Sequence, residues 1–458
     1  MAIYIHNTLT RKKEEFTPLH PPAVNIYSCG VTVYDDCHIG HARSLYIFEV
    51  IRRYLKYRGF EVRFVRNITD IDDKIINRAN ELKVSWDELV AKYISGYYQD
   101  LASLGLQKAD SEPRATENIP GMLKFIQGLI DKGYAYPTST GVYFSVRKFK
   151  DYGKLSGQGI EQMLTGVRKD ADETKEDPLD FALWKTSKPG EPSWPSPWGA
   201  GRPGWNIECS VMSMDSLKTE TLDIHAGGRD LIFPHHENEI AQAEAFTGKA
   251  FAKYWIHHGL LTINGQKMSK SLGNFITIKD ALKKYHQAAL KIFFLHAHYS
   301  SPIDFSEKKM EEATQALQRI MIFAEKKVAD PALQMGDIRE IELLKGKFIE
   351  AMDDDFNTPR GLAAVFDLVT LANKNEDNPG FHQKAGVVLT ELLGIMGISL
   401  AVDSGDESAG MINRKVEERN RARKDKNYAL SDALKKELEG LGVIIEDTKN
   451  GTTWRRKL

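Results

Sequence analysis

Cysteine is scarce in this sequence, with only Cys29, Cys37 and Cys209 among 458 residues. A small, odd number of thiols excludes a disulfide-stapled scaffold and favours a reducing compartment. Long apolar runs are also lacking: stretches such as 292–295 fall far short of the ~20 residues that span a membrane. No basic segment followed by an apolar one marks the N-terminus, so we expect no signal peptide. We therefore expect a soluble, cytoplasmic protein without membrane contact.

A strong charge of one sign is absent as well. The chain has 62 Lys and Arg against 63 Asp and Glu, a formal net charge of −1, so any nucleic-acid surface must be local. Apolar residues make up 42% and charged residues 27%, which is typical of a folded globular chain and excludes wholesale disorder. The length exceeds what one hydrophobic core supports, which predicts two to four domains.

The stretch from residue 24 to residue 65 has the pattern of a strand, a helix and a second strand. Residues 24–27 form a short β-type run, and an alternating strand pattern returns over residues 60–65. Between them, apolar side chains recur at helical spacing at Ile47, Val50, Ile51, Tyr54 and Leu55, and Gly59 is a suitable helix end. Such a crossover joins parallel strands. It predicts an α/β fold whose doubly wound, Rossmann-like sheet binds ligands at the carboxyl ends of its strands.

Changes in composition and pattern divide the chain into seven segments. They are two halves of the Rossmann-like sheet domain (1–115 and 205–260), an insertion between them (116–204), a region around a basic loop (261–306), a helical bundle (307–403), a linker (404–412) and a small C-terminal module (413–458). The insertion ends in a Pro-, Gly- and Trp-rich stretch, 189–204, in which we expect no regular structure. Apolar stripes mark two of the bundle's helices, one at Leu317, Ile320, Met321 and Ala324 and the other at Ile341, Leu344, Phe348 and Met352.

Charge is distributed unevenly in the last third of the chain. Residues 307–405 carry 11 basic and 17 acidic side chains, whereas residues 411–458 carry 13 basic and 8 acidic ones, a net charge of +5. Many of these basic side chains lie in an expected helix over 414–426, and others form the stretch Arg455-Arg456-Lys457 near the C-terminus. A solvated charged helix is the ordinary explanation. A basic module that follows a linker and carries Trp454 is also suited to RNA phosphate contacts and base stacking.

His38-Ile39-Gly40-His41 stands between the first strand and its helix. Backbone N–H groups and the helix dipole make this position a phosphate site, and imidazoles there can donate hydrogen bonds to phosphate oxygens as charge develops. Two surface histidines in a loop would be the simpler explanation of this motif by itself.

A basic loop, Lys267-Met268-Ser269-Lys270-Ser271, follows more than two hundred residues later. Asn264-Gly265 precedes it and Gly273-Asn274 follows it, so we expect a flexible loop bounded by turns. Two lysines in a mobile loop are suited to closing over a triphosphate. A solvated basic loop is common, but the two motifs in this order around a βαβ sheet are far more specific than either alone.

Four side chains make a possible metal site. His235 and Glu239 are four residues apart, so both project from one face of a helix, for which Pro234 is a plausible start. Cys29 ends the first strand, and we place Cys209 on the resumed half of the sheet. Two thiolates, an imidazole and a carboxylate form a tetrahedral set suited to Zn²⁺. His236 and Glu237 are rival ligands, interpreted as supporting or packing residues, and Cys37 as a small loop residue.

Both motifs resemble the signature pair of class I aminoacyl-tRNA synthetases, and the surrounding stretches resemble the cysteinyl-tRNA synthetases in particular. The similarity covers essentially the whole chain. The stretches that carry it are Tyr27-Ser28-Cys29-Gly30, 67–74 (NITDIDDK), 190–205, Ile207-Glu208-Cys209-Ser210, 233–239 (FPHHENE) and 451–457 (GTTWRRK). At Asn206 this chain departs from many bacterial relatives, which have histidine there, so the resemblance assigns that position no role.

The resemblance implies roles for individual residues. It implies catalytic roles for His38, His41, Lys267 and Lys270; nucleotide contacts for Gly40, Gly227, Gly228, Asp230 and Lys270; substrate contacts for Gly30, Thr69 and Trp205; and one zinc ion held by Cys29, Cys209, His235 and Glu239. Packing against a loop would be an equally ordinary role for Trp205.

The implied activity is ATP-dependent ligation of L-cysteine to tRNA(Cys) through a cysteinyl adenylate, with Mg²⁺ accompanying ATP. Zinc would select the substrate thiolate over the hydroxyl of serine, and the basic C-terminal module would bind the anticodon. We expect a monomer. One rival is a related ligase that passes cysteine to a sugar amine, as mycothiol ligases do, although such an acceptor requires no basic module. A second rival is a non-catalytic RNA-binding relative. The complete pairs His38/His41 and Lys267/Lys270 argue against it.

Overall fold

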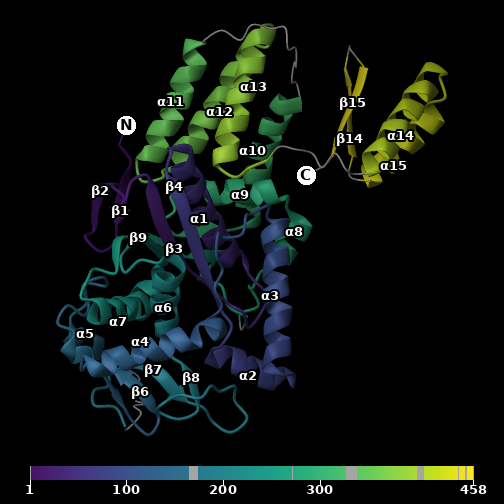
Figure 1. Ribbon diagram of the computed structural model, residues 1–458. Helices are drawn as coiled ribbons and strands as arrows, with labels where there is room; N and C mark the ends of the chain where they lie inside the picture. Colours follow the sequence, from purple (N-terminus) through teal and green to yellow (C-terminus); the bar gives the residue numbers. More distant parts are fainter. Residues whose placement is uncertain are drawn as a thin grey trace.

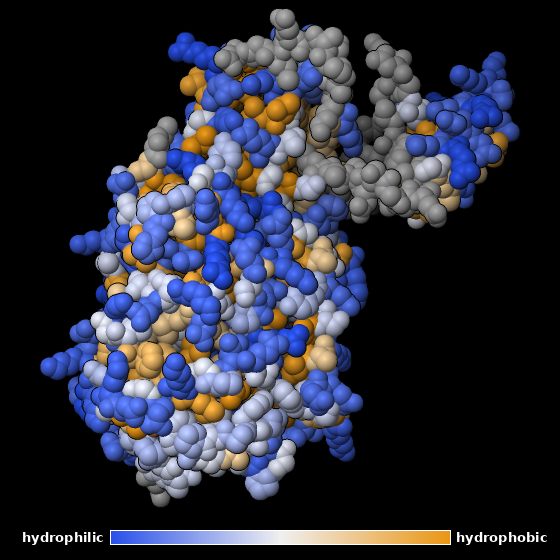
Figure 2. Space-filling view, in the orientation of Figure 1, coloured by the Kyte–Doolittle hydropathy of each residue, from blue (hydrophilic) through white to orange (hydrophobic). Residues whose placement is uncertain are grey.

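The computed structural model describes residues 2–164, 174–270, 272–325, 338–399, 407–441, 443–448 and 451–456. Within these ranges no helix is both long and apolar enough to cross a membrane. Hydrophilic side chains dominate the face drawn in Figure 2, and hydrophobic residues interrupt it in separate small groups. Scattered apolar residues of this kind are normal on a globular surface.

A four-stranded parallel sheet in the order β10-β9-β3-β4 forms the centre of the molecule (Figure 1). Its strands are β3 (Ala23–Thr32), β4 (Glu61–Thr69), β9 (Leu222–Gly228) and β10 (Ala252–His258). Helices α1 (Ile39–Tyr57), α2 (Asp73–Leu82), α3 (Trp86–Ser103), α6 (Trp205–Leu217) and α7 (Glu237–Thr247) belong to this domain, with short turns η3 (Arg229–Leu231) and η4 (Ile232–His236). The predicted Rossmann-like parallel sheet is confirmed. An antiparallel pair, β1 (Tyr4–Asn7) and β2 (Lys12–Glu15), lies at its edge.

Helix α1 crosses from β3 to β4, as the apolar spacing predicts. Its apolar side chains, including Ile47, Val50 and Leu55, are buried in the main hydrophobic core. His38 is its N-cap, and Gly59 follows its C-cap with a φ of +88°, which a residue with a Cβ rarely adopts.

The insertion forms an antiparallel sheet of its own in the order β5-β6-β7-β8. Its elements are η1 (Ala115–Asn118), α4 (Ile119–Asp131), β5 (Ala135–Pro137), β6 (Gly141–Phe144), η2 (Val146–Lys148), α5 (Ile160–Leu164), β7 (Phe181–Thr186) and β8 (Gly201–Pro203). The expectation that residues 189–204 contain no regular structure is wrong, because β8 lies within them. A three-residue edge strand tolerates its terminal Pro203, since an edge strand needs few backbone donors.

A smaller three-stranded sheet, β12-β11-β13, carries the basic loop. It consists of β11 (Leu261–Ile263), β12 (Gln266–Lys267) and β13 (Ile303–Phe305), accompanied by α8 (Ile278–Lys284) and α9 (Gln287–Leu295). Asn264 and Gly265 have positive φ angles of 50° and 75°, so the predicted turn before the loop is confirmed.

The helical bundle is built from α10 (Glu307–Glu325), α11 (Arg339–Asp353), α12 (Thr358–Lys374) and α13 (Pro379–Ile395). All four predicted apolar positions of α11 are buried. In α10 the buried stripe ends at Phe323, whereas Met321 and Ala324 are only half-buried. Two tyrosines of α1 join the bundle to the sheet domain: Tyr54 donates to Asp353 Oδ1 at 2.6 Å and Tyr46 donates to the Met396 carbonyl at 2.7 Å.

The C-terminal unit consists of α14 (Glu407–Lys424), α15 (Tyr428–Gly440), β14 (Val443–Thr448) and β15 (Gly451–Arg456), and it stands apart from the other helices in Figure 1. It has its own small core of Ile412, Val416, Leu438 and Val443. The expectation of a linker over 404–412 is wrong for residues 407–412. These residues belong to α14, because Ile412 packs into this core. Residues 404–406, Lys457 and the side chains of Trp454, Arg455 and Arg456 lie outside the described residues.

Candidate metal cluster and phosphate-binding site

Both candidate sites lie where the central parallel strands end. Strand β3 pairs with β9 through Tyr27↔His225 and Ser28↔Ala226, which places Cys29 close to the end of β9. The carboxyl ends of parallel strands meet at one edge of a sheet, where α/β proteins bind ligands.

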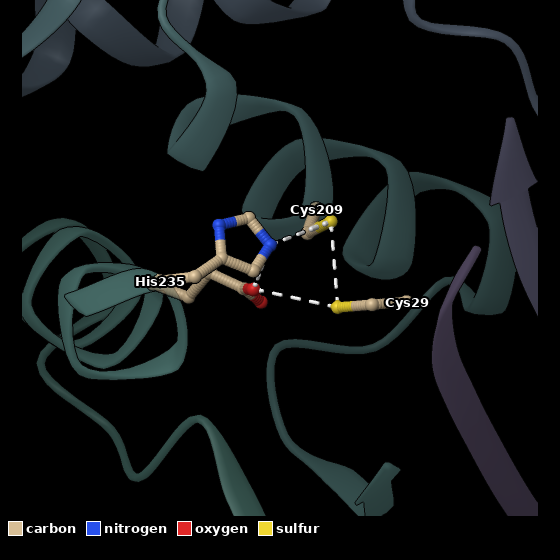
Figure 3. Close-up of side chains that lie close together, drawn as sticks. Cys29, Cys209 and His235 are labelled. Atoms are coloured by element: carbon tan, nitrogen blue, oxygen red, sulfur yellow. Dashed lines mark hydrogen bonds and ion pairs between the residues drawn. The ribbon is translucent and has the colours of Figure 1, made fainter. Parts of the chain in front are cut away.

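The four predicted metal ligands form one cluster (Figure 3). Sγ of Cys209 lies 3.7 Å from Sγ of Cys29 and 3.6 Å from Nε2 of His235. Glu239 Oε1 completes the group, at 3.6 Å from Sγ of Cys29 and 2.9 Å from Nε2 of His235. Residues from β3, α6, η4 and α7 thus direct one donor atom each toward a common point.

The spacing of these donors fits a tetrahedral ion. Zinc-type bonds of about 2.3 Å to sulfur and about 2.0–2.2 Å to nitrogen or oxygen put neighbouring ligand atoms roughly 3.4–3.8 Å apart. The three distances that involve sulfur fall in this range. The shorter contact between His235 and Glu239 is a hydrogen bond, in which the imidazole N–H occupies the direction that a metal would take.

Glu239 is the electrostatic centre of the cluster. It is fully buried, and its second oxygen accepts a hydrogen bond from His225 Nε2 at 2.7 Å. Burial opposes its ionisation, but His225 and His235 outweigh it and lower the pKa of Glu239 to about 2. The same contact acts on His235: burial lowers its pKa, whereas Glu239 and Cys209 raise it to about 10.

The two thiols differ in how readily they ionise. Burial raises the pKa of Cys29 well above its ordinary value, with Cys209 as the next cause. Burial acts in the same direction on Cys209, but the hydrogen bonds from Cys29 and His235 overcome it and lower its pKa to about 6. A cation between the thiols would favour the thiolate form of both, since the thiolate is the metal-binding species.

Two details of the predicted ligand positions are wrong. Cys209 lies on helix α6 rather than on a strand of the sheet. Pro234 does not start the helix that carries His235 and Glu239: both Pro234 and His235 belong to η4, and regular α7 begins at Glu237. The four-residue spacing still brings the two donors together because η4 runs directly into α7.

Sequence reasoning missed a second group around the cluster. Cys29, His225, His236 and Glu239 also bring one donor atom each within 4.8 Å of one another. His236 Nε2 lies 3.2 Å from Cys29 Sγ, which is within hydrogen-bonding distance. The signal for His225 was its position in β9, a fully buried strand in which Asp223 is the other polar residue. The rival Glu237 points elsewhere, accepting from the backbone N–H of Ser156 at 2.8 Å.

Trp205 and Asn206 hold the His235 ring from two sides. The indole of Trp205 stacks on it with ring centroids 3.9 Å apart, and Asn206 Oδ1 accepts from His235 Nδ1 at 2.8 Å. An imidazole whose Nδ1 carries the proton presents the lone pair of Nε2 to a metal. Trp205 is 38% exposed, so it borders the cluster from the open side.

The other predicted substrate contacts lie on the same edge of the sheet. Thr69 is buried and donates its hydroxyl to Glu208 Oε2 at 2.8 Å. Burial, followed by the neighbouring Cys209, raises the pKa of Glu208 well above its ordinary value. A Cβ on Gly30 would lie 1.6 Å from the Asn67 carbonyl oxygen, so the approach of β4 already requires glycine there.

His38 and His41 are stacked at the start of α1, with ring centroids 3.7 Å apart. Nδ1 of His38 accepts from the backbone N–H of Gly40 and His41, and Nδ1 of His41 accepts from the backbone N–H of His38. Burial lowers the pKa of His38 to about 4 and holds the pKa of His41 well below its ordinary value. Both rings are therefore neutral near pH 7, and both Nε2 atoms carry the proton that a phosphate oxygen would accept.

The basic loop meets this motif directly. A Cβ on Gly40 would lie 2.9 Å from the His38 ring and 3.5 Å from Cε of Met268, so glycine permits the contact. Lys267 ends β12 with an exposed side chain. Lys270 pairs with Asp35, which precedes the first motif by three residues. Ser271 lies outside the described residues.

The glycines predicted to contact nucleotide lie at the same edge of the sheet. Gly227 and Gly228 are the last residues of β9, and a Cβ on Gly227 would lie 2.6 Å from the His236 ring. Asp230 is exposed in the adjoining turn η3. The structure thus brings the predicted phosphate, nucleotide and metal residues to one edge of one sheet.

Three family models match consecutive parts of the chain. That for "tRNA synthetases class I (C) catalytic domain" matches residues 15–315, that for the DALR domain residues 347–401, and that for "Cysteinyl-tRNA ligase anticodon binding domain" residues 410–455. Relatives named cysteine–tRNA ligase are similar over their whole length. One from Thermodesulfovibrio yellowstonii is 48% identical and one from Caldicellulosiruptor saccharolyticus 49%, each over 99% of both chains.

The fold has solved counterparts. A methionyl-tRNA synthetase of Mycobacterium tuberculosis, in complex with methionyl-adenylate, superposes with a TM-score of 0.62. The match covers 82% of this chain and 90% of that one at 14% sequence identity.

The cluster predicts one tightly held metal ion per chain. Cys209→Ser is expected to weaken metal binding at least about tenfold, because even the loss of a residue that only orients a ligand costs that much. Elemental analysis and competition with a chromophoric chelator measure the effect. Cys37→Ser is the matched control, since Cys37 is a buried thiol outside the cluster and should leave the metal in place. Equal metal retention by both variants would contradict the assignment.

Proposed function

The chain belongs to the cysteine–tRNA ligase family, and from this premise we propose how its residues carry out the reaction. The enzyme joins L-cysteine to tRNA(Cys) with ATP. The cysteine carboxylate attacks the α-phosphate of ATP, releasing pyrophosphate and leaving cysteinyl adenylate. A terminal ribose hydroxyl of tRNA then accepts the cysteinyl group. The observation that carries this proposal is the meeting of the two motifs at the start of α1, at the same edge of the sheet as a cluster with two cysteine side chains.

The first motif acts on the phosphates. Each neutral imidazole of His38 and His41 donates its Nε2–H, because each Nδ1 is occupied by backbone N–H groups. Such preoriented donors stabilise charge that develops in the transition state. Gly40 allows the phosphates close to the helix N-terminus, and Gly227, Gly228 and Asp230 contact the adenosine. Mg²⁺ accompanies ATP.

The second motif closes over the triphosphate. Lys267 and Lys270 supply positive charge as the bond to the α-phosphate changes. In the structure, Lys270 lies against the Asp35 carboxylate and near the ring of Phe275. Triphosphate oxygens replace that carboxylate as the partner of Lys270 when the loop closes.

The metal cluster selects the amino acid, and we propose that its ion is zinc. Rejecting serine ~10⁴-fold requires roughly 5.5 kcal/mol, more than a fit of shape usually supplies. A zinc ion bound there would offer the substrate thiolate a coordination bond that a neutral hydroxyl cannot equal. Cys29, Cys209, His235 and Glu239 would hold it, while Thr69, Trp205 and Gly30 line the amino-acid pocket.

The helical bundle and the C-terminal unit bind tRNA(Cys). The unit's net charge of +5 over residues 411–458 supports phosphate contacts, and the family model for residues 410–455 is that of an anticodon-binding domain. Transfer of cysteine to a sugar amine is not favoured, because such an acceptor has no anticodon. The proposed enzyme is a cytoplasmic monomer, and its unpaired cysteines agree with a reducing compartment.

The decisive test is which amino acid supports exchange of pyrophosphate into ATP. Cysteine should support it and serine should not. Exchange driven by another amino acid, or by none, would refute the proposal, whereas exchange without tRNA charging would favour another acceptor.

Lys270→Ala is expected to slow cysteine-dependent pyrophosphate exchange by about 10²-fold or more, while cysteine affinity stays nearly unchanged, because the lysine acts on transition-state charge. Rates are measured at saturating cysteine and ATP. Lys279→Ala is the matched control: Lys279 pairs with the neighbouring Asp36 and lies outside the motif. Similar rates in both variants would mean that the loop does not act in catalysis.

Removal of residues 404–458 should leave pyrophosphate exchange intact and weaken tRNA charging, because the C-terminal unit has a separate core and contributes phosphate contacts to the RNA. Binding of tRNA by the full chain should fall steeply with salt, and the truncation should flatten that dependence. Filter binding across a salt series measures both. A truncated chain with normal tRNA affinity would refute the anticodon assignment for this unit.

A further inference from the structure

Arg43 is a buried cation in the first turns of α1, two residues after His41. Its side chain is fully buried, and burial lowers its pKa to about 10. The five hydrogen bonds donated by its guanidinium all end on main-chain carbonyl oxygens. The hydrogen bonds to those carbonyls offset the free-energy cost of removing the charge from water. The positions of the carbonyls and of Arg43 are therefore linked.

The carbonyls belong to two segments that are far apart in the sequence. Those of Gly259 and Leu260, at 2.7 and 3.0 Å, lead into β11. Those of His298, Tyr299 and Ser301, at 3.5, 3.3 and 2.5 Å, precede β13. One guanidinium therefore fastens to α1 both segments that lead into the small sheet.

These segments also approach each other closely. The Gly259 N–H donates to the Tyr299 carbonyl at 2.8 Å, and a Cβ on Gly259 would lie 2.2 Å from the Ser301 oxygen. Carbonyl oxygens that converge on one point repel one another unless a cation lies between them. The planar guanidinium fork of arginine can donate to several oxygens at once, which the ammonium of lysine does less well.

The sheet that Arg43 holds in this way carries the basic loop. Strand β11 pairs with β13 and with β12, at whose end Lys267 stands. The far side of the loop is tied to the first motif by the backbone: Ile39 N–H donates to Ile276 at 3.1 Å, and Ile278 N–H donates to Cys37 at 2.9 Å. On the N-terminal side of the loop, Arg43 makes the corresponding connection to α1 through the Gly259 and Leu260 carbonyls.

We propose that Arg43 is a positioning residue, which fixes the β11–β12 hairpin and hence Lys267 relative to His38 and His41. The part played by Lys267 rests on the proposed function, whereas the fixing of the hairpin does not. Two measurements therefore test the two parts separately.

The first measurement is amide hydrogen exchange in Arg43→Lys, which retains the charge and loses the fork. Exchange is expected to become faster at the amides of Gly259 and Ile303, whose hydrogen bonds join the two segments that Arg43 fastens. Arg52→Lys is the matched control, because Arg52 is buried in the same helix but bonds to Asp110 and the Lys108 carbonyl. Unchanged exchange at the two amides, or the same change in both variants, would overturn the proposal.

The second measurement is single-turnover formation of cysteinyl adenylate. Arg43→Lys is expected to slow it about tenfold and Arg43→Ala about 10²-fold, as a misplacement of roughly 1 Å can do, with the Kd of cysteine changed less than about twofold. The same experiment with Arg52→Lys should give a rate within about twofold of the parent. A full adenylation rate in both Arg43 variants would refute the positioning role.

A double-mutant cycle with Lys267→Ala identifies the pathway. If Arg43 acts through the hairpin, Lys267→Ala should slow adenylate formation by a smaller factor in the Arg43→Lys chain than in the parent. If the two residues act independently, the two factors should multiply. Multiplying effects would overturn the proposed link between the two residues. If Lys267→Ala alone leaves adenylation unchanged, the proposed function of the loop fails, and hydrogen exchange still decides whether Arg43 fixes the hairpin.

Discussion

The parallel pairing of β3 with both β4 and β9 is the constraint on which the candidate sites depend. It brings Cys29, Thr69 and Gly228 to one edge of the sheet, although nearly two hundred residues separate the first from the last. Side chains alternate between the two faces of a strand, so a shift of one residue would turn Cys29 away from Cys209 and Glu239. The register of a single strand therefore decides whether the cluster exists.

The second requirement is the neutralisation of buried charge. Glu239 is fully buried, and an isolated carboxylate there would be very unfavourable. His225 and His235 each approach one of its oxygens, which keeps the carboxylate ionised and its ligand oxygen directed toward Cys29. Binding of a cation would displace the proton between His235 and Glu239, so metal uptake at this site would be coupled to proton release. The hydrogen bonds of Glu239 thus hold its oxygen in the position from which it would bind a cation.

Local patterns predicted the elements whose cause is local. The first βαβ unit, the stripe of α11 and the Asn264-Gly265 turn all follow from periodicity or from a residue that tolerates positive φ. The pattern failed for α6, because this helix is buried on most sides and lacks the polar face that reveals a helical period. The four-residue spacing placed His235 with Glu239. Their grouping with the two cysteines followed from donor chemistry only as a possible site, and the resemblance to a family strengthened it. Contacts such as His236 with Cys29 depend on tertiary packing and leave no local signal.

The basic loop combines fixed ends with an exposed tip, and this division suits its chemistry. Main-chain hydrogen bonds hold Ile276 and Ile278 against the residues around His38, while β12 holds the opposite side. Between these ends, Lys270 is exposed and paired with Asp35. A lysine that acts on developing charge must reach the phosphates during the reaction and release pyrophosphate afterwards, which a rigid contact would hinder. The Lys270 end of this ion pair is exposed and therefore well solvated, so exchanging Asp35 for a phosphate oxygen would not require Lys270 to leave a buried position. In the proposed reaction, the fixed ends would supply the precision of the site, and the exposed tip would let the loop open and close.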